Sequence, residues 1–500
     1  MTLSVTSVIF LVAALPFVVC AASLNKPDRV ESVIGQITGV GKNENYVTHN
    51  SPEKSDQKSI FALNTLLGRG INLSGLEQAS EGDWNFKLNI DALSIIADGN
   101  FNSVRLPIKW DSRAAAIGSD MNGTYPIEQA FFNRVDSVVQ EALSEGLRVI
   151  INMHLYEDLI NDPIAESERF LNLWDQIAKH YSEKPDSVYF EILNEPAAVF
   201  SEKPQLWNKL LAQALQTIRI SNPDRAVIVG PVGWNLIGNL KLLKLPDDDR
   251  LIVSVHYYDP GHFTHQGAEW VHPMLPVGAD WLPQRQRLGS ELQNWSWDTD
   301  VEFGDHWVEA TFARSGAALN LYTQPKNFPN TMSVRLSGFT KLAIICGAES
   351  KFTDTEIRLI HNSTKWATFE ADLSNCPNNA NQIAIQNLVE GGGTVSLRGG
   401  EFCKGKDCRP FFMSEHEAIE MAFESARQWG ESEHRPMNLG EFGAYNRADM
   451  GSRALWTKSV QQAAQARGMS SHYWEFDRGF GVWDRKSGRW VQPLYRALQP

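Results

Sequence analysis

Residues 188–196 read VYFEILNEP, a short apolar run that ends in a polar pair and a proline. Such a run is typical of a buried strand in a parallel sheet, and the amphipathic stretch at 206–220 is typical of a helix packed on that sheet. The same alternation recurs outward in both directions. The predicted strands span residues 70–73, 103–107, 149–154, 188–194, 226–230, 251–256, 437–441 and 471–476. Eight strands with intervening helices predict an α/β fold, the (β/α)8 or TIM barrel.

The interval between the sixth and seventh predicted strands is too long for one helix. Residues 294–411 alternate apolar and polar side chains in short runs separated by Gly, Asn, Pro and Ser, which is typical of β structure. We expect an inserted all-β sandwich of jelly-roll type here, between strand six and helix six of the barrel. The barrel is then formed by residues 61–293 and 412–500.

The charge balance excludes some classes of partner. The chain has 500 residues with 46 Lys and Arg against 59 Asp and Glu, a net charge of −13, and no basic run. Electrostatic binding to nucleic acid or to anionic lipid is therefore not expected. The 16 tryptophans are a large number, and indole rings that line a groove offer flat apolar faces to ligands such as sugars.

The amino-terminal segment predicts export. Residues 8–19, VIFLVAALPFVV, form an apolar run too short to span a bilayer, and Cys20-Ala21-Ala22 resembles a cleavage site. We interpret residues 1–22 as a signal peptide and the polar residues 23–60 as a linker. The mature protein is then expected to be secreted and to have no membrane segment.

Four cysteines remain after residue 22: Cys346, Cys376, Cys403 and Cys408, all within the predicted insertion. An even number in a secreted chain implies two disulfides, for which three connectivities are possible. We favour Cys403–Cys408 as a tight loop and Cys346–Cys376 as the longer link. The spacings match no zinc motif, so no metal is expected.

Polar and aromatic residues follow the predicted barrel strands, at the end where such barrels hold their active sites. They are Arg105, His154, Asn194, Glu195, Trp234, His256, Tyr258, Glu441 and Trp474.

Two of these residues are carboxylates that follow apolar strands, Glu195 and Glu441. Cleavage of a glycosidic bond needs such a pair, one protonated to donate to the leaving oxygen and one ionised to attack the sugar or to activate water. Arg105 could keep the attacking carboxylate ionised, and Asn194 could bind the sugar 2-hydroxyl. Glu191 lies four residues before Glu195. We interpret it as a buried structural carboxylate and suggest Arg69 as its partner.

In its sequence motifs the chain resembles glycoside hydrolase family 5, the cellulase-type retaining β-glycanases. The resemblance covers about 60% of the chain and rests on eight motifs in the family's order: GRGINLSGLE (68–77), FNSVRLPIKW (101–110), VIINMHLYEDL (149–159), VYFEILNEP (188–196), IVGPVGWN (228–235), SVHYYDPGHFTHQGAEW (254–270), PMNLGEFGAY (436–445) and SHYWEFDRGFGVWD (471–484).

The resemblance implies specific roles. Glu195 corresponds to the general acid/base and Glu441 to the nucleophile, with Arg105, His154, Asn194, His256, Tyr258 and Trp474 around the attacked sugar. Glu77, His265 and Trp234 correspond to further substrate contacts. Two departures are seen: the chain has His154-Leu155 where many relatives have His-His, and its first loop, which holds Glu77, is one residue shorter.

The resemblance implies a secreted, monomeric, retaining endo-β-1,4-glucanase that acts on a β-linked polysaccharide and needs no cofactor. Mannan, xyloglucan and mixed-linkage glucan are alternative substrates, because the same carboxylates serve all of them. A non-catalytic polysaccharide-binding protein is the alternative from another class. The insertion resembles carbohydrate-binding modules, in which Trp307, Tyr322, Phe328 and Trp366 could form a sugar platform, or else it only shapes the far end of the cleft.

Overall fold

The computed structural model describes residues 58–500 apart from 117–123, 155, 290–291, 295, 306, 324–327, 349–350 and 353–356. The predicted signal peptide and most of the predicted linker lie outside these residues. The linker was predicted to reach residue 60, whereas helix α2 (Ile60–Leu67) begins there, because the Ser59 hydroxyl accepts a hydrogen bond from the Ala62 amide and caps it.

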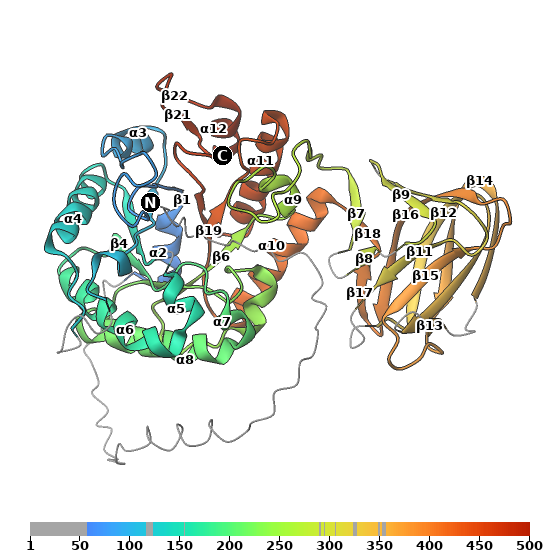
Figure 1. Ribbon diagram of the computed structural model, residues 1–500, viewed down its shortest axis with the longest axis horizontal. Helices are drawn as coiled ribbons and strands as arrows, with labels where there is room; N and C mark the ends of the chain where they lie inside the picture. Colours follow the sequence, from blue (N-terminus) through green and yellow to red (C-terminus); the bar gives the residue numbers. More distant parts are fainter. Residues whose placement is uncertain are drawn as a thin grey trace, which may run out of the picture.

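Eight parallel strands close into a barrel, as predicted (Figure 1). The order around the barrel is β1 (Arg69–Asn72), β2 (Ser103–Leu106), β3 (Arg148–Asn152), β4 (Val188–Glu191), β5 (Val227–Val229), β6 (Leu251–Tyr257), β19 (Met437–Phe442) and β20 (Ser470–Tyr473).

An outer layer of helices covers the barrel. These are α3 (Ala92–Asp98), α4 (Gln129–Ser144), α5 (Glu157–Asn161), α6 (Pro163–His180), α7 (Val199–Glu202), α8 (Pro204–Ser221), α9 (Gly261–Thr264), α10 (Glu415–Ser432), α11 (Met450–Ala466) and α12 (Gln492–Leu498), with short 3-10 turns η1 (Asp111–Arg113) and η2 (Ile237–Leu242). Of the described helices, none is long and apolar enough to cross a membrane.

Helix α2 closes the amino-terminal end of the barrel. Its Ile60, Leu63 and Leu67 pack in one buried cluster with inward-facing strand residues, among them Ile150 and Ile252. Asn64 of the same helix donates a hydrogen bond to the Met437 carbonyl. Because α2 fills this opening, a binding site can form only at the opposite opening, where the carboxyl ends of the strands lie.

The insertion leaves the barrel after β6 and returns before α10, as predicted. Its outgoing strand β7 (Gln286–Leu288) pairs with the returning strand β18 (Phe412–Ser414). Between them, antiparallel strands form a separate lobe beside the barrel (Figure 1). They are β8 (Gln293–Asn294), β9 (Thr299–Phe303), β10 (Val308–Phe312), β11 (Ala318–Tyr322), β12 (Thr331–Ala348), β13 (Lys351–Phe352), β14 (Ile357–Asp372), β15 (Gln382–Asn387), β16 (Gly393–Lys404) and β17 (Asp407–Pro410).

Strand β12 holds the insertion together. Its first half pairs with β16 and its second half with β15, while β14 follows it along both halves. The register shifts between Leu336 and Gly338, where Gly338 has φ 135° and a Cβ atom would lie 2.8 Å from the Thr394 carbonyl oxygen. Only glycine fits this position. The bulge there divides β12 into the half that pairs with β16 and the half that pairs with β15, so the described strands form one continuous ten-stranded sheet around a single apolar core.

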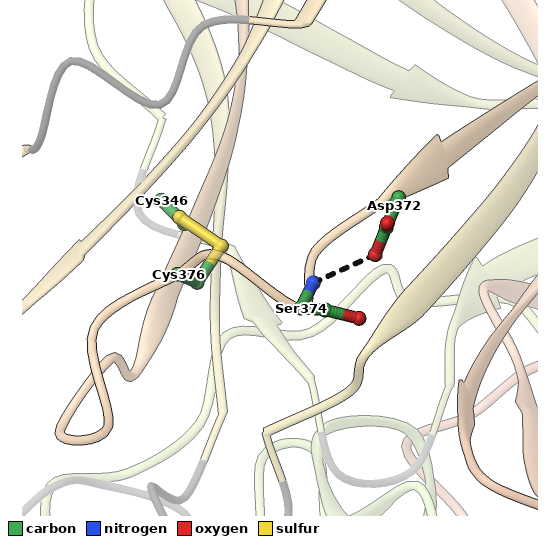
Figure 2. Close-up of a disulfide and its surroundings, with 4 residues drawn as sticks. All are labelled: Cys346, Asp372, Ser374 and Cys376. Carbon is green, nitrogen blue, oxygen red and sulfur yellow. Dashed lines mark hydrogen bonds between the residues drawn. A yellow bond between two sulfur atoms is a disulfide. The ribbon is translucent and has the colours of Figure 1, made fainter.

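The four cysteines form the disulfides Cys346–Cys376 and Cys403–Cys408, the connectivity favoured from the sequence. Figure 2 shows the first, which links β12 to the loop after β14, next to the turn in which Asp372 accepts a hydrogen bond from the Ser374 amide. The second closes the hairpin between β16 and β17.

Candidate active site

The predicted polar residues come together at the carboxyl ends of the barrel strands. Arg105 lies on β2, His256 on β6 and Glu441 on β19. Asn194 and Glu195 follow β4, which ends at Glu191, three residues earlier than predicted. Tyr258 and Trp474 follow β6 and β20 directly, and His154 lies two residues after the end of β3.

Arg105 is the centre of the site and is fully buried. Its Nε and Nη2 donate to the two carboxylate oxygens of Glu191 at 2.6 and 2.8 Å. Its Nη1 donates to Glu441 at 2.7 Å and to Asn72 at 2.9 Å, and its Nη2 also donates to Asn194 Oδ1 at 2.7 Å. All five N–H groups of the guanidinium therefore have an acceptor. Burial alone lowers the pKa of Arg105, but the charges of Glu191 and Glu441 outweigh it and raise the pKa.

The suggested partner of Glu191 is therefore wrong. Arg69 donates instead to the backbone carbonyls of Asn100 and Leu498. The reason is that the Arg105 side chain extends from β2 to Glu191 on β4, two strands away in the closed barrel.

Glu441 is buried and held at both oxygens. Oε1 accepts from Arg105, and Oε2 accepts from the Tyr258 hydroxyl at 3.0 Å. Burial raises the pKa of Glu441, while the nearby His256 and Arg105 oppose this effect. Burial also raises the pKa of Tyr258 well above its ordinary value, reinforced by the charge of Glu441, so that Tyr258 keeps its proton and remains a donor.

Glu195 has a different environment. Its backbone has φ 46°, in the left-handed region that is unfavourable for residues with a side chain. Its Oε1 lies 2.7 Å from His256 Nδ1. Burial raises the pKa of Glu195 to about 8, although Arg105 opposes the rise, and the charge of Glu191 adds to it. Glu195 is therefore protonated at neutral pH.

His256 sets the direction of the Glu195 carboxyl group. Burial lowers the pKa of His256 to about 4, so the imidazole is neutral at neutral pH. Asn235 Nδ2 donates to His256 Nε2 at 3.2 Å, which leaves Nδ1 as the nitrogen that carries the proton. Nδ1–H then donates to Glu195 Oε1, and the acidic proton of Glu195 is left on Oε2.

The two carboxyl groups are close together. One oxygen of Glu195, one oxygen of Glu441 and a His256 nitrogen all lie within 4.8 Å of one another. These three side chains could also act as ligands to a cation, but the hydrogen bonds that Glu441 accepts from Arg105 and Tyr258 already explain its position. Retaining glycosidases hold their carboxyl groups about 5–5.5 Å apart and inverting enzymes about 6.5–9.5 Å. A separation of no more than 4.8 Å between these two oxygens is shorter than the inverting range and favours the retaining geometry.

Aromatic rings surround the carboxyl groups. Trp474 stacks on His154 with ring centroids 5.7 Å apart and planes 7° from parallel. His265 meets the Tyr258 ring edge-on at 4.9 Å. Burial lowers the pKa of His154 well below its ordinary value and that of His265 to about 4, so both rings are neutral. Among the described residues, none accepts or donates a hydrogen bond at the buried His154 Nδ1.

Trp234 and Glu77 were also predicted to contact the substrate. Trp234 is partly exposed in the loop after β5, next to Asn235. Glu77 is buried and accepts a hydrogen bond from the Gly75 amide of its own loop; burial raises its pKa to about 7. One carboxylate oxygen of Glu77 is thus engaged within the first loop, and a substrate contact by Glu77 stays a prediction.

The sequence reasoning missed Asn72 and Asn235. Asn72 accepts from Arg105 and donates to the Gly440 and His472 carbonyls, which ties β1 to the strands beside Glu441. Both residues lie inside motifs quoted above, GRGINLSGLE and IVGPVGWN. Asn72 is a polar amide at the end of an apolar strand, and this was the signal that could have identified it; Asn235 lies six residues after the end of β5 and has no such signal.

A cavity of about 650 Å³ lies beside the site, between the barrel and the insertion. The barrel contributes His256, Tyr258 and η2 to its lining, and the insertion contributes the Cys403–Cys408 hairpin with Asp407. Of the four aromatic residues suggested as a sugar platform, Phe328 packs against the core of the insertion and Trp366 is covered by the Arg398 guanidinium.

Comparison with known proteins gives consistent results. A model of the cellulase family, glycosyl hydrolase family 5, matches residues 66–299. Endoglucanase H of Acetivibrio thermocellus is 35% identical over 221 residues, which is 43% of this chain and 24% of that protein. Cellodextrinase A of Ruminococcus flavefaciens is 32% identical over 223 residues, 42% of this chain and 63% of that protein. The chain thus spans less than two-thirds of the length of either relative.

The endoglucanase Cel5A from the hyperthermophilic Thermotoga maritima has a similar structure. It is 30% identical, with a TM-score of 0.58, and the match covers 88% of this chain and 100% of that one. Further structures of the T. maritima protein, 29% identical with a TM-score of 0.59, are described as complexes with cellobiose and with mannotriose.

Proposed function

Because the chain belongs to glycosyl hydrolase family 5, we propose that it is a retaining endo-β-1,4-glucanase in which Glu441 is the nucleophile and Glu195 the general acid/base. The observation that carries this assignment is the asymmetry of the two carboxyl groups. Glu441 receives an ion pair and a hydroxyl donor, which favour its ionised form. Glu195 is half-buried, contacts only the neutral His256 among the described charged or ionisable side chains, and has a pKa of about 8.

In the first step, Glu441 Oε attacks the anomeric carbon while the bond from that carbon to the glycosidic oxygen breaks. The leaving oxygen takes the proton from Glu195 Oε2, and a glycosyl ester forms on Glu441. In the second step, the Glu195 carboxylate removes a proton from water, the water oxygen attacks the anomeric carbon, and the ester bond to Glu441 breaks. The sugar keeps its anomeric configuration because it is inverted twice.

The remaining residues position these two groups and the sugar. Arg105 fixes the Asn194 Oδ1, which leaves the amide NH2 group of Asn194 to donate to the 2-hydroxyl of the attacked sugar. The paired His154 and Trp474 rings form one wall of the subsite. We assign Trp234, in the loop after β5, to the departing sugar.

The names of the relatives favour β-1,4-glucan as the substrate. Mannan is the second candidate, because a structural relative is described with both cellobiose and mannotriose bound. The proposed contact of Asn194 with the 2-hydroxyl does not distinguish glucan from mannan, so the choice between them depends on measured rates.

The experiment is a reducing-sugar assay of the wild type, Glu195→Gln and Glu441→Ala on carboxymethylcellulose, mannan, xyloglucan and mixed-linkage glucan. The wild type is expected to release reducing ends fastest from β-1,4-glucan. Each variant is expected to lose activity by at least about 10³-fold while it still binds the polysaccharide. Activity near the wild-type level in either variant would reject the assignment, and binding without turnover in the wild type would favour the non-catalytic alternative.

We further propose that the insertion shapes the cleft on the η2 side. Its Cys403–Cys408 hairpin and the barrel residue Tyr258 line the same cavity, and the covered Trp366 and packed Phe328 speak against a flat sugar platform formed by all four suggested aromatic residues. Two disulfides in one domain are typical of secreted proteins, which supports the proposal that the protein acts outside the cell.

A further inference from the structure

A group of polar side chains lies inside the barrel, directly beneath the catalytic residues. The interior of such a barrel is usually filled by branched apolar side chains, and here Ile150 of β3 and Ile228 of β5 follow this rule. Four other strands instead place polar side chains in the interior, and all of them are buried. They are Ser103 (β2), Ser254 (β6), Asn438 (β19) and His472 (β20).

The hydrogen bonds of His472 have a fixed direction. The Ser103 hydroxyl donates to the Leu67 carbonyl at 2.7 Å and therefore accepts from His472 Nε2–H at 2.9 Å. At its other nitrogen, Nδ1, His472 accepts from Asn438 Nδ2 at 3.2 Å. Burial, together with the charge of Arg105, lowers the pKa of His472 to about 3. The imidazole is therefore neutral, and both of its nitrogens are used.

Asn438 extends these hydrogen bonds to two more elements. Its Oδ1 accepts from the Ser254 hydroxyl at 3.2 Å, and its Nδ2 also donates to the Ser470 hydroxyl at 2.8 Å. Ser470 donates to Asn64 of α2 at 2.7 Å, and Asn64 donates to the Met437 carbonyl. Such a buried network is rigid, because displacement of one member leaves its partners unsatisfied.

The network lies one layer below the reacting groups. Residues two apart on a strand point to the same side of the sheet. Ser103 therefore lies beneath Arg105 on β2, and Ser254 lies beneath His256 on β6. Each of these serines is thus next to a side chain that forms a hydrogen bond with a catalytic carboxyl group.

Strand β19 reaches Glu441 through a bulge that packs on the same network. Its pairing with both neighbouring strands shifts register after Leu439, so Gly440 is the extra residue. A Cβ atom at position 440 would collide with the Ser254 hydroxyl and would lie 2.9 Å from His256 Nε2. The backbone just before Glu441 is therefore in direct contact with a side chain of the network.

We propose that His472 is a positioning residue, which through Asn438 holds β19 so that Glu441 meets the anomeric carbon of the sugar. Arg105 and Tyr258 hold the carboxyl group itself, and the network holds the strand that carries it. A shift of about 1 Å in a reacting group can slow a reaction about 10²-fold. This inference rests on the proposed function, because it requires that Glu441 is the nucleophile.

The test measures kcat/KM of the full chain on 2,4-dinitrophenyl and 4-nitrophenyl β-cellobioside. Dinitrophenol departs with little help from an acid and 4-nitrophenol needs more, so a displaced nucleophile slows both reactions equally, whereas a displaced acid slows the second more. His472→Phe keeps a ring without nitrogens and is expected to lower both values by about 10–100-fold. His472→Gln can donate to Ser103 and accept from Asn438, so it should restore most of the loss on both substrates.

Ser471→Ala is the matched control. Ser471 is next to His472 on β20, faces outward and donates to Gln461 of α11 at 3.0 Å. The change removes one buried hydrogen bond and should lower the melting temperature by a few degrees, while kcat/KM on both substrates stays within about twofold of the wild type.

A folded His472→Phe protein with kcat/KM within about twofold of the wild type, or with a larger loss on the 4-nitrophenyl substrate, would overturn the proposal. If this variant does not fold, Ser103→Ala replaces it, because it removes only the hydroxyl that accepts from His472. An equal loss of about three- to tenfold on both substrates would then support the positioning role, and an absent or unequal loss would refute it.

If the wild type cleaves neither substrate, the proposed function fails. Crystal structures of the wild type and His472→Phe then decide the positioning role. A Glu441 carboxyl group displaced by more than about 0.5 Å relative to Arg105 would support this role, and superimposable carboxyl groups would refute it.

Discussion

Arg105 contacts three other residues of the site through one side chain. It neutralises Glu191, favours the ionised form of Glu441 and orients Asn194, with every donor used. A buried charge with several partners is costly to disturb, because removal of one partner leaves the others uncompensated.

Replacement of Arg105 by Lys tests this point. An ammonium group is a point donor that cannot reproduce the planar fork between Glu191 and Glu441. We expect kcat/KM to fall by about 10²–10³-fold and the free energy of unfolding to fall by about 3 kcal/mol. Arg134→Lys is the matched control, since its pair with Glu81 is partly exposed and should cost less than about 1 kcal/mol. Equal losses in the two variants would contradict the central role of Arg105.

The raised pKa of Glu195 predicts the alkaline side of the pH profile. The acid must carry its proton to assist the departing sugar, and burial places its pKa at about 8. We therefore expect kcat/KM to decrease above about pH 8 with the loss of one proton. A profile that stays flat to pH 10 would show that Glu195 is not the proton donor.

The same pKa predicts a cost in stability. The carboxyl pKa is near 4.5 in the unfolded chain and about 8 in the folded one, so the contribution of Glu195 is intact below pH 4.5 and is lost as the pH rises through 8. Glu195→Gln removes this loss, which at pH 8 is about 4 kcal/mol, and should stabilise the protein at pH 8 but by little at pH 4. Thermal unfolding at the two pH values measures the difference, and a destabilised variant at pH 8 would contradict it.

At the scale of the elements, the pattern of the sequence predicted the eight barrel strands because each is a short apolar run with helical periodicity on both sides. It also predicted which residues surround the two catalytic carboxyl groups, because the carboxyl ends of parallel strands meet at one edge of the sheet. The Glu191–Arg105 pair could not be predicted, because the partner depends on how far each side chain reaches across the closed barrel. The Asn235–His256 contact depends likewise on a left-handed turn, with φ 56° at Asn235, that no residue pattern there signals.

The two disulfides should contribute differently to the insertion. Cys346–Cys376 closes a segment with a sequence separation of 30, and Cys403–Cys408 one with a separation of 5. In the chain-entropy account these loops correspond to about 3.5 and about 2 kcal/mol. We expect calorimetry of the two Cys→Ser double variants to show a larger loss for Cys346 and Cys376, confined to the transition of the insertion. The reverse order would show that native contacts rather than loop entropy decide the effect.

At the scale of the whole molecule, the barrel and the insertion have separate apolar cores and are connected through the paired strands β7 and β18. Separate cores favour independent folding of the two parts. The site residues all belong to the barrel, and the insertion contributes only to the cavity beside them.

Replacement of residues 289–411 by a two-residue Asn-Gly turn would convert β7 and β18 into a hairpin. We expect the shortened chain to fold and to keep its kcat/KM on an aryl β-cellobioside within about threefold, because no catalytic group is removed. Its relative rates on different polysaccharides should change, since one wall of the cleft is lost. An unfolded or inactive barrel would contradict the independence of the two parts.

The central claim is that Glu441 becomes covalently bonded to the sugar while Glu195 supplies the proton. The most direct test is mass-spectrometric peptide mapping of the protein after reaction with a 2-deoxy-2-fluoro-β-cellobioside that has a good leaving group, a reagent that forms the glycosyl ester but hydrolyses it slowly. The label is expected on the peptide that contains Glu441, as an ester of that side chain. A label on Glu195, or no covalent adduct in a protein that turns over the parent substrate, would contradict the account.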